Sequence, residues 1–451
     1  MSDVTAQEIT PADLEAAREL CAFIESAPSM FHTIASIRAR LDAQGFTYLP
    51  ECAAWQLEAG GHYYTVRNNS SVIAWKMPER LGAETLHFQV CASHADSPTF
   101  KIKSVAETAG AAGSLRLDVE AYGGMIDYTW FDRPLGVAGR VLVREGSRVE
   151  SRLVAPDRSL ALIPSVPIHM NREVNKGFAP NRTKDVCPVV SAGLLEAGSL
   201  DAVLAEELGV RPEQIVARDL FLVNRQPPCV WGSASEFVSA GKLDDLACAY
   251  TSLEAFVSAS NPACATVYCC FDNEEVGSNT KQGAMSTLLR DVLARVSAAW
   301  GAGEEGYLRA LAASMLVSCD NAHALHPNHP ELHDDANAPQ LGGGIVVKEA
   351  ANQHYCTDAF SRAAFLAVCA DAGVPVQTFA NRSDMPGGST LGNLSNMQAS
   401  MHGVDVGLPQ LAMHSSYETA HVRDVRLAIQ ALSAFYGANL VIDGADSVTL
   451  R

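Results

Sequence analysis

After residue 236 the sequence alternates between helical and strand-like segments, and this pattern constrains the fold more than any other feature. Residues 243–259 and 283–300 have the character of helices, whereas CATVYCCF (264–271) and LAASMLVSC (311–319) are typical of buried strands. Strands that alternate with helices favour a largely parallel sheet. We therefore expect an α/β fold, with a mixed, mostly parallel sheet flanked by helices.

A different pattern occupies residues 99–235. Short β-prone runs such as SLRLDVEAY and ARDLFLV alternate there with glycine and proline. A chain of 451 residues is long enough for two or three domains of about 150 residues each. We interpret 99–235 as an inserted β-rich domain that mediates dimerisation, and 1–98 together with 236–451 as one α/β domain.

The charge of the chain narrows the classes of partner. Lys and Arg number 33 and Asp and Glu 51, so the formal charge is −18, and such a chain repels phosphate backbones. We expect no nucleic acid as a partner. No apolar run approaches the roughly 20 residues that cross a bilayer, and the acidic N-terminal segment lacks the apolar core of a signal peptide. We therefore expect no membrane association and a cytoplasmic location.

Two patterns that could suggest cofactors have simpler interpretations. The twelve cysteines include no C-x-x-C pair, which predicts reduced core residues and no thiolate metal site. Residues 301–306 match G-x-G-x-x-G but follow a helical pattern, whereas the dinucleotide-binding motif follows a strand. We interpret 301–306 as a loop.

Acidic and imidazole side chains follow three separate apolar strands. They are the segments 93–96 after the strand predicted at 84–92, 272–275 after the second strand, and 320–323 after the third. Sites in α/β sheets gather at the carboxyl ends of the strands. Each acidic group alone could cap a helix or a turn. Together they predict one shared site.

The residue types at these ends predict a metal site. Histidine with Asp and Glu, and without thiolates, suits zinc, manganese or cobalt in a catalytic site. Three carboxylates and a hydroxide would balance two divalent ions. Of the adjacent Glu274 and Glu275, one can bind metal while the other acts as a base. His414, directly after an apolar stretch, offers a second imidazole, and the glycine-rich turn 384–390 allows a ligand to approach the backbone.

In this order, these residues resemble the aspartyl aminopeptidase family, a group of di-zinc metallopeptidases. The resemblance covers nearly the whole chain. The matching segments are ASHADSPTFKIK (92–103), IPSVPIHMNREVNKGF (163–178), GKLDDLACAY (241–250), FDNEEVGS (271–278), DNAHALHPNH (320–329), VVKEAANQHY (346–355), NRSDMPGGSTLGN (381–393) and GLPQLAMHSSYE (407–418).

The resemblance implies a role for each residue of the metal site, with two zinc ions per subunit, one of them replaceable by manganese or cobalt. The implied ligands are His94 and Asp320 for one zinc, Glu275 and His414 for the other, and Asp244 for both. Glu274 would be the general base that acts on a water bridging the two metals. Asp96 would orient His94.

The resemblance also implies residues that face the substrate. His169 would reach the active site of a neighbouring subunit, and Lys348 would meet an acidic side chain of the substrate. Asp384 and Met413 are further expected substrate contacts. The chain departs from the best-known members of the family at Asp245, at 383–388 and at His354, all near segments that face the substrate.

The expected function is therefore that of a metal-dependent aminopeptidase that removes the N-terminal residue of peptides and favours Asp or Glu. The resemblance further implies a homododecamer built from dimers. Two alternatives remain open from the residues alone. One is a di-metal aminopeptidase or deacylase with broad or neutral specificity, and the other is a metal-binding scaffold without catalytic activity.

Overall fold

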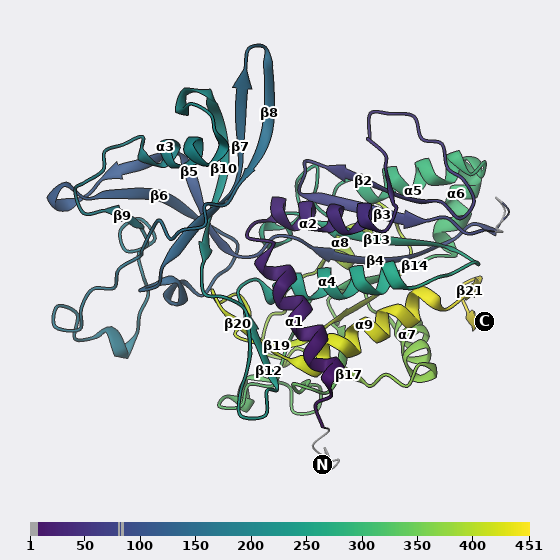
Figure 1. Cartoon of the computed structure of the whole chain (residues 1–451). Helices are drawn as coiled ribbons and strands as arrows, with labels where there is room; N and C mark the ends of the chain where they lie inside the picture. The colour runs from purple at the N-terminus through teal and green to yellow at the C-terminus, as the bar shows by residue number, and fades with distance from the viewer. Residues whose placement is uncertain (1–7, 80–81, 83–84) are drawn as a thin grey trace.

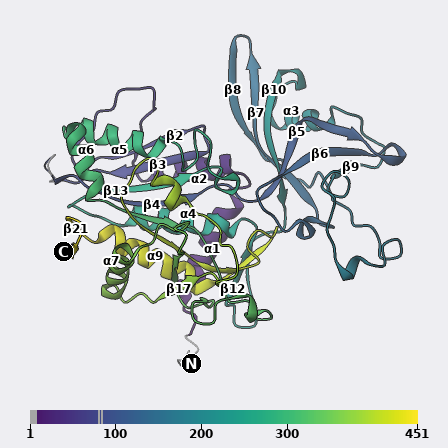
Figure 2. The same ribbon diagram turned by 180° about the vertical axis from the view of Figure 1, so that it is seen from behind.

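The computed structural model describes residues 8–79, 82 and 85–451. The first seven residues of the acidic N-terminal segment, and residue 84 at the start of one predicted strand, lie outside the described part. Figures 1 and 2 show a larger α/β part and a smaller β-rich part that projects from one side of it. The predicted α/β fold, with a mixed, mostly parallel sheet flanked by helices and a β-rich part beside it, is confirmed, and the β-rich part proves to be an antiparallel sheet.

A nine-stranded sheet forms the centre of the α/β part. Its middle strands β13, β4 and β14 are parallel to one another, and β18 continues the parallel run beyond β14. In spatial order the strands are β1 (Thr47–Tyr48), β2 (His62–Arg67), β3 (Ser71–Lys76), β13 (Ala265–Phe271), β4 (Phe88–His94), β14 (Met315–Cys319), β18 (His402–Gly407), β16 (Ile345–Glu349) and β17 (Val376–Ala380).

Both faces of this sheet are buried under helices. Along β13, Tyr268 and Cys270 join the core on one face, while Val267 and Cys269 join the core on the other, because successive side chains of a strand point to opposite sides. The first face packs against α1 (Pro11–Glu25), α2 (Met30–Ala43), α4 (Leu243–Ser258), α7 (Ala359–Asp371) and α9 (Val422–Gly437). The second packs against α5 (Leu288–Ala299), α6 (Gly303–Ala312) and α8 (Leu391–Ser395).

The β-rich part is a six-stranded antiparallel sheet with a core of its own. Its strands, in spatial order, are β8 (Arg148–Val154), β7 (Leu135–Glu145), β10 (Ile215–Asn224), β5 (Thr99–Ala109), β6 (Leu115–Tyr122) and β9 (Val189–Ser191), and α3 (Ser199–Leu208) packs against them. We retain 99–235 as the proposed limits of the inserted domain. Near the end of that range, β11 (Cys229–Trp231) pairs with β12 (Phe237–Ala240), which belongs to a third sheet.

A third sheet of five strands lies beside the carboxyl ends of the central strands. Its order is β11, β12 (Phe237–Ala240), β20 (Glu418–His421), β19 (Pro409–Leu411) and β15 (Ala322–His323). The loop between β19 and β20 contains His414, so this sheet holds that residue near the end of β14. A hairpin of β21 (Leu440–Asp443) and β22 (Ser447–Leu450) ends the chain.

Helix α6 occupies residues that we expected to be loop and strand. It runs from Gly303 to Ala312. The loop predicted at 301–306 is therefore wrong for 303–306. The strand predicted at 311–319 is wrong at its start, because the observed strand begins at Met315. Glu304 and Glu305 lie in its first turn, where acidic side chains interact favourably with the helix dipole. All twelve cysteines are free, and no helix in the described ranges is long and apolar enough to span a bilayer.

Candidate metal centre

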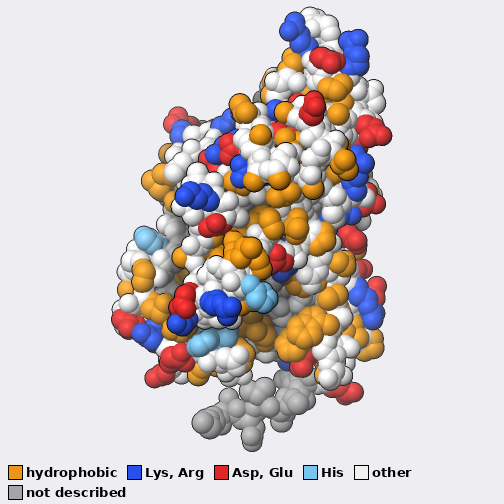
Figure 3. Space-filling view, turned by 90° about the vertical axis from the view of Figure 1, so that its left-hand side faces the viewer, with side chains coloured by type: hydrophobic (Ala, Val, Ile, Leu, Met, Phe, Trp, Pro, Cys, Tyr) orange, Lys and Arg blue, Asp and Glu red, His pale blue; other side chains and the backbone are white. Residues whose placement is uncertain are grey.

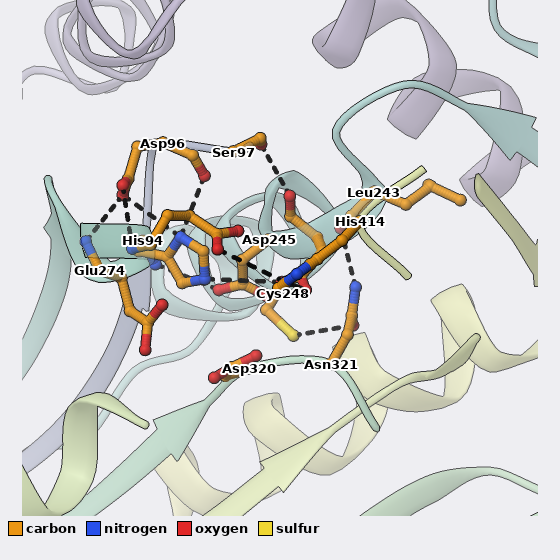
Figure 4. Close-up of polar contacts among 12 residues, drawn as sticks. His94, Asp96, Ser97, Leu243, Asp245, Cys248, Glu274, Asp320, Asn321 and His414 are labelled. Atoms are coloured by element: carbon orange, nitrogen blue, oxygen red, sulfur yellow. Dashed lines mark hydrogen bonds and ion pairs between the residues drawn. The ribbon is translucent and has the colours of Figure 1, made fainter. Parts of the chain in front are cut away.

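The polar residues after the central strands meet at one edge of the nine-stranded sheet. His94 ends β4 and lies opposite Phe271, the last residue of β13, so Glu274 follows only three positions beyond this pair. Asp320 directly follows β14, and its amide donates to Val406 of β18. Figure 4 shows His94, Glu274 and Asp320 around one space. Parallel pairing of adjacent strands accounts for this convergence.

Asp244 lies between the two imidazoles of the site. Its Oδ1 is 3.5 Å from His94 Nε2, and its Oδ2 is 3.3 Å from His414 Nε2. His414 Nε2 is also 3.4 Å from Glu275 Oε2. Ligand atoms within 4.8 Å of one another form three overlapping groups: His94, Asp244, Asp245 and Asp320; His94, Glu274 and Glu275; and Asp244, Glu275 and His414.

The oxygen atoms of this site fit a bound cation. Asp244 Oδ1, Asp245 Oδ1 and Glu275 Oε1 are buried without a hydrogen-bond partner among the described residues. Leaving a buried carboxylate oxygen unpaired is costly, and a divalent ion supplies the missing partner. Imidazole nitrogen with carboxylate oxygen is a donor set that zinc accepts in catalytic sites. The residues present therefore fit the metal that they were predicted to bind.

The imidazoles and carboxylates perturb one another strongly. Burial alone would lower the pKa of His94, but Asp245, Asp244 and Asp96 outweigh it and hold that pKa well above its usual range. Burial would raise the pKa of Asp244, but its contacts with His414 and His94 lower it well below the usual range. The two imidazoles and the carboxylate of Asp244 therefore attract one another across the site.

Glu274 has the position and acidity of a proton-transfer group. It begins the short turn η6 (Glu274–Val276) after β13, and it faces a cavity of about 130 Å³ that His94, Asp320 and Lys348 also line. Burial raises the pKa of its carboxyl to about 8, and the nearby Asp320 adds to this rise. A general base works best when its pKa lies near the operating pH. Glu274 is therefore the best-placed base in this cavity.

Asp96 contacts His94 in a different way from the predicted one. The backbone carbonyl of Asp96, not its carboxylate, hydrogen-bonds His94 Nδ1 at 3.0 Å. The carboxylate lies 3.4 Å from the same nitrogen and also accepts the amides of Glu274 at 3.1 Å and Glu275 at 3.2 Å. Asp96 thus orients the imidazole and also fixes the backbone that carries the two glutamates.

Lys348 is a buried cation in the wall of the same cavity. Its side chain is 2% exposed, and its ammonium lies 3.7 Å from Asp320 Oδ2 and donates to the carbonyl of Asn321 at 3.2 Å. The ammonium also lies 5.1 Å from the centre of the Tyr355 ring. Burial lowers the pKa of Lys348, but Asp320 and Tyr355 outweigh it and raise it overall. The side chain therefore remains charged.

The other predicted substrate contacts are placed in different surroundings. Met413 lines the cavity next to His414. Asp384 is exposed and forms an ion pair with Arg382 at 2.6 Å. It does not line the cavity. Residues 388–390 of the same turn line the cavity instead. His169 is exposed in the β-rich part.

Glu418 is a site residue that the sequence analysis missed. It is 1% exposed, and its carboxylate accepts the amide of His414 at 2.7 Å and the amide of Asp244 at 3.0 Å. It thus holds the backbone of two predicted ligands. A lone glutamate at the start of a short strand gives no sequence signal for this role.

Asp245 was noted only as a departure from the family pattern. Its Oδ2 accepts the amide of His94 at 3.1 Å. Burial and the neighbouring Cys248 hold the pKa of its carboxyl well above the usual range. Asp245 Oδ1 has no hydrogen-bond partner among the described residues, and Asp245 lies in one ligand group with His94, Asp244 and Asp320.

Comparison with known proteins places these features in a family. The family described as Aminopeptidase I zinc metalloprotease (M18) matches residues 23–436. The Probable M18 family aminopeptidase 2 of Clostridium novyi is 40% identical over 431 residues, which cover 93% of this chain and 98% of that protein. The protein of the same description from Pseudomonas paraeruginosa is 39% identical, over 92% of this chain and 97% of its own length.

Solved structures share the fold over almost the full length. A chain in the complex of Ape4 with Nbr1 is 32% identical, with a TM-score of 0.91 over 96% of this chain and 88% of that one. The S. cerevisiae mApe1 dodecamer gives a TM-score of 0.82 at 26% identity, covering 95% of this chain and 97% of its own. An M18 aminopeptidase from Thermotoga maritima has the same fold at 23% identity, with a TM-score of 0.84 over 95% of this chain and 97% of that one.

Proposed function

Because this chain belongs to the M18 family of zinc metallo-aminopeptidases, we propose that it removes N-terminal Asp or Glu residues from peptides. The family establishes a hydrolase that is an aminopeptidase and uses zinc. The preference for acidic residues is the finer part of the proposal. The observation that carries it is the buried ammonium of Lys348 in the cavity that contains Glu274.

Charge complementarity supports an acidic substrate side chain. The Lys348 ammonium has three donors, and among the described residues one hydrogen bond is made, to the carbonyl of Asn321. The nearest carboxylate oxygen, from Asp320, is at 3.7 Å, beyond ordinary hydrogen-bond length. Donors are therefore left for a ligand. A carboxylate of the substrate would satisfy them with a charge-assisted hydrogen bond.

The proposed metal site holds two zinc ions, with the ligands in the order that the family resemblance implied. His94 and Asp320 would hold one ion, Glu275 and His414 the other, and Asp244 both. The overlapping groups around Asp244 support this assignment, because each of its oxygens faces a different imidazole. When bound, zinc supplies Lewis acidity, which makes water nucleophilic near neutral pH and polarises a carbonyl.

The remaining steps of the proposed reaction belong to the side chains of the protein. The Glu274 carboxylate accepts the proton of the attacking water at one of its oxygens, and the same carboxyl then donates that proton to the nitrogen of the leaving amine. The hydrogen bond that the backbone amide of Glu274 donates to Asp96 Oδ1 holds the backbone that carries the Glu274 carboxylate at the cavity. Lys348 would hold the acidic side chain of the substrate, which fixes the scissile carbonyl relative to Glu274.

Self-association is part of the proposal. Large apolar side chains are exposed in the loops between β8 and α3, among them Ile168 at 45%, Met170 at 82% and Leu194 at 95%. Figure 3 looks at the side of the molecule on which the β-rich part projects and shows hydrophobic side chains gathered there. Such patches are typical of protein interfaces. Since the mApe1 relative is a dodecamer, we propose the same assembly here, with His169 of this stretch reaching a neighbouring subunit.

Sedimentation at working concentration tests this assembly. We expect a particle of twelve chains. A monomer that is fully active would contradict both the proposed assembly and the role of His169.

Lys348→Met should selectively weaken hydrolysis of acidic substrates. A hydrogen bond to a charged group contributes about 1.5–3 kcal/mol, so kcat/KM for Asp- and Glu-initiated reporters should fall about tenfold or more. Methionine keeps the length of the side chain, so the value for a Leu-initiated reporter should stay within about threefold. A panel of aminoacyl and acyl reporters, measured on the wild type and the variant, gives these values.

Two controls make the panel decisive. The zinc content of Lys348→Met must match the wild type, because Lys348 also lies near Asp320. Lys103→Met, in an ion pair with Asp118 on the β-rich sheet and outside the proposed assembly surface, should leave every reporter unchanged. Equal losses on Asp and Leu reporters would exclude the selectivity role of Lys348. A wild type that prefers Leu or acyl reporters would support the alternative of a broad aminopeptidase or a deacylase.

A further inference from the structure

A segment of the β-rich part runs directly past the metal centre of the same chain. It begins at Tyr122, the last residue of β6, and continues to Thr129 in the turn η3 (Asp127–Trp130). The Tyr122 hydroxyl donates to Asp96 Oδ2 at 2.8 Å and accepts from Asn273 Nδ2 at 2.8 Å. One side chain of the antiparallel sheet therefore joins the two loops that follow β4 and β13.

The ring of Tyr122 is held by its own sheet. It is 9% exposed and packs edge-on against Phe221 of β10, with the ring centres 5.5 Å apart. Burial and the carboxylate of Asp96 raise the pKa of the Tyr122 phenol, so its proton stays in place. The hydroxyl is consequently a fixed donor whose position is set by the β-rich sheet.

The acceptor of this hydrogen bond controls the two glutamates. The Asp96 carboxylate receives the Tyr122 hydroxyl and the Glu275 amide on Oδ2, and the Glu274 amide on Oδ1. The adjacent Asn273 has a left-handed backbone, with φ of 63°, a conformation that a non-glycine residue adopts at some cost and that needs support from its surroundings. The Tyr122 hydroxyl supports this turn in two ways, through its hydrogen bond to Asp96 and through the hydrogen bond that it accepts from Asn273.

The rest of the segment contacts the loop that carries the second imidazole. The amide of Ile126 donates to the carbonyl of His414 at 3.0 Å. Three residues further, Thr129 Oγ1 accepts the amide of Ser416 at 2.9 Å, and the Thr129 carbonyl accepts the Ser416 hydroxyl at 2.6 Å. The segment thus fixes the backbone on both sides of Ser415, next to a predicted zinc ligand.

Gly123 allows the close approach on which these contacts depend. Its φ is 80°, and a Cβ placed there would lie 3.1 Å from the Cβ of Glu275. Such a contact is tighter than ordinary van der Waals packing, and the positive φ disfavours any larger residue. The backbone of the β-rich part is therefore packed against Glu275 as closely as glycine permits.

We propose that Tyr122 is a positioning residue of the metal centre, and that the segment from Tyr122 to Thr129 makes the β-rich part a structural component of that centre. Through Asp96 and Asn273 it orients Glu274 and Glu275, and through Ile126 and Thr129 it orients the loop of His414. The β-rich part then has a role inside its own chain, in addition to any role in assembly. The kinetic part of this inference rests on the proposed function, whereas the metal-binding part does not.

Tyr122→Phe tests the proposal with one atom removed and the ring packing retained. Loss of a group that orients metal ligands typically weakens metal binding by about 10–100-fold, and we expect a zinc dissociation constant raised by that factor in chelator competition. For the zinc-saturated enzyme we expect kcat to fall by about tenfold or more, with KM within about twofold, because the substrate pocket around Lys348 is untouched.

The matched control is Tyr48→Phe, which removes the hydroxyl of a partly exposed tyrosine outside that segment and should change neither zinc affinity nor kcat. Gly123→Ala should weaken zinc binding at least as much as Tyr122→Phe, since the added methyl group displaces Glu275. Wild-type zinc affinity and kcat in Tyr122→Phe would overturn the proposal even if Gly123→Ala fails to fold. A wild type that binds zinc but cleaves no peptide would refute the proposed function, while the affinity comparison would still decide this inference.

Discussion

Replacing Glu274 by Gln should lower kcat at least about a hundredfold, the usual contribution of a positioned acid–base group. Glutamine keeps the shape of the side chain and the backbone amide that donates to Asp96. Its amide cannot take a proton from water or return it to the leaving amine. Burial raises the pKa of the Glu274 carboxyl, so it holds a proton taken from water more firmly than an exposed glutamate does. Steady-state hydrolysis of an Asp-initiated reporter measures this effect.

Zinc analysis separates loss of the base from loss of the metal. Glu274→Gln should retain the zinc content of the wild type, because the proposed ligands are other residues. Glu304→Gln, in the first turn of α6 and remote from the proposed chemistry, serves as the control and should keep full activity. Activity near wild type in zinc-loaded Glu274→Gln would show that another group is the base.

Replacing Asp244 by Asn should have the largest effect on metal binding. Asp244 faces both imidazoles, and its buried Oδ1 has no hydrogen-bond partner among the described residues. Losing its charge should therefore weaken both proposed zinc sites. Since removal of a supporting residue costs about 10–100-fold in metal affinity, loss of a shared ligand should exceed that range. Chelator competition and residual hydrolysis measure the two consequences.

The adjacent residue offers a matched control. Asp245→Asn makes the same chemical change one position along the chain, where one oxygen of the side chain accepts the amide of His94. It should lower zinc affinity far less than Asp244→Asn does, since an asparagine oxygen can keep the hydrogen bond from His94, and Asp245 belongs to one ligand group whereas Asp244 belongs to two. If Asp244→Asn binds two zinc ions as tightly as Asp245→Asn does, Asp244 is not a shared ligand.

The residues at the strand ends could be predicted because their positions follow from local pattern. His94 and Asp320 directly end or follow apolar strands, and parallel pairing brings the carboxyl ends of β4, β13 and β14 to one edge. Asp244 could not be predicted from local pattern in the same way. It lies at the start of a buried helix, and the resemblance to a family, not the pattern around it, identified it.

The supporting residues could not be predicted because their roles depend on contacts between distant parts of the chain. Glu418 meets the amide of Asp244 across 174 positions, and Tyr122 meets Asn273 across 151. Neither residue has a neighbour in sequence that reveals its partner. Tyr122 in addition lies on a strand whose alternating pattern indicates only a half-buried sheet. The β-rich part packs against the site only in the folded tertiary structure, so local sequence does not reveal this contact.

The contact of Asp96 with His94 shows a similar limit at short range. A carboxylate is a usual partner of the second nitrogen of a metal-binding histidine, and the family resemblance implied Asp96 in that role. In the structure the Asp96 carbonyl makes the shorter contact, and the carboxylate is also used by the amides of the following glutamates. The role of Asp96 stays a prediction, and the atom that contacts His94 depends on a turn that sequence pattern does not specify.

The central claim is that Asp244 joins two zinc sites at the ends of the central strands. Anomalous diffraction at the zinc edge, on crystals of the active wild-type protein, tests it most directly. We expect two zinc peaks per chain, one beside His94 and Asp320 and the other beside Glu275 and His414, with Asp244 in contact with both. A single peak, or zinc bound away from Asp244 in a protein that hydrolyses peptides, would contradict the account.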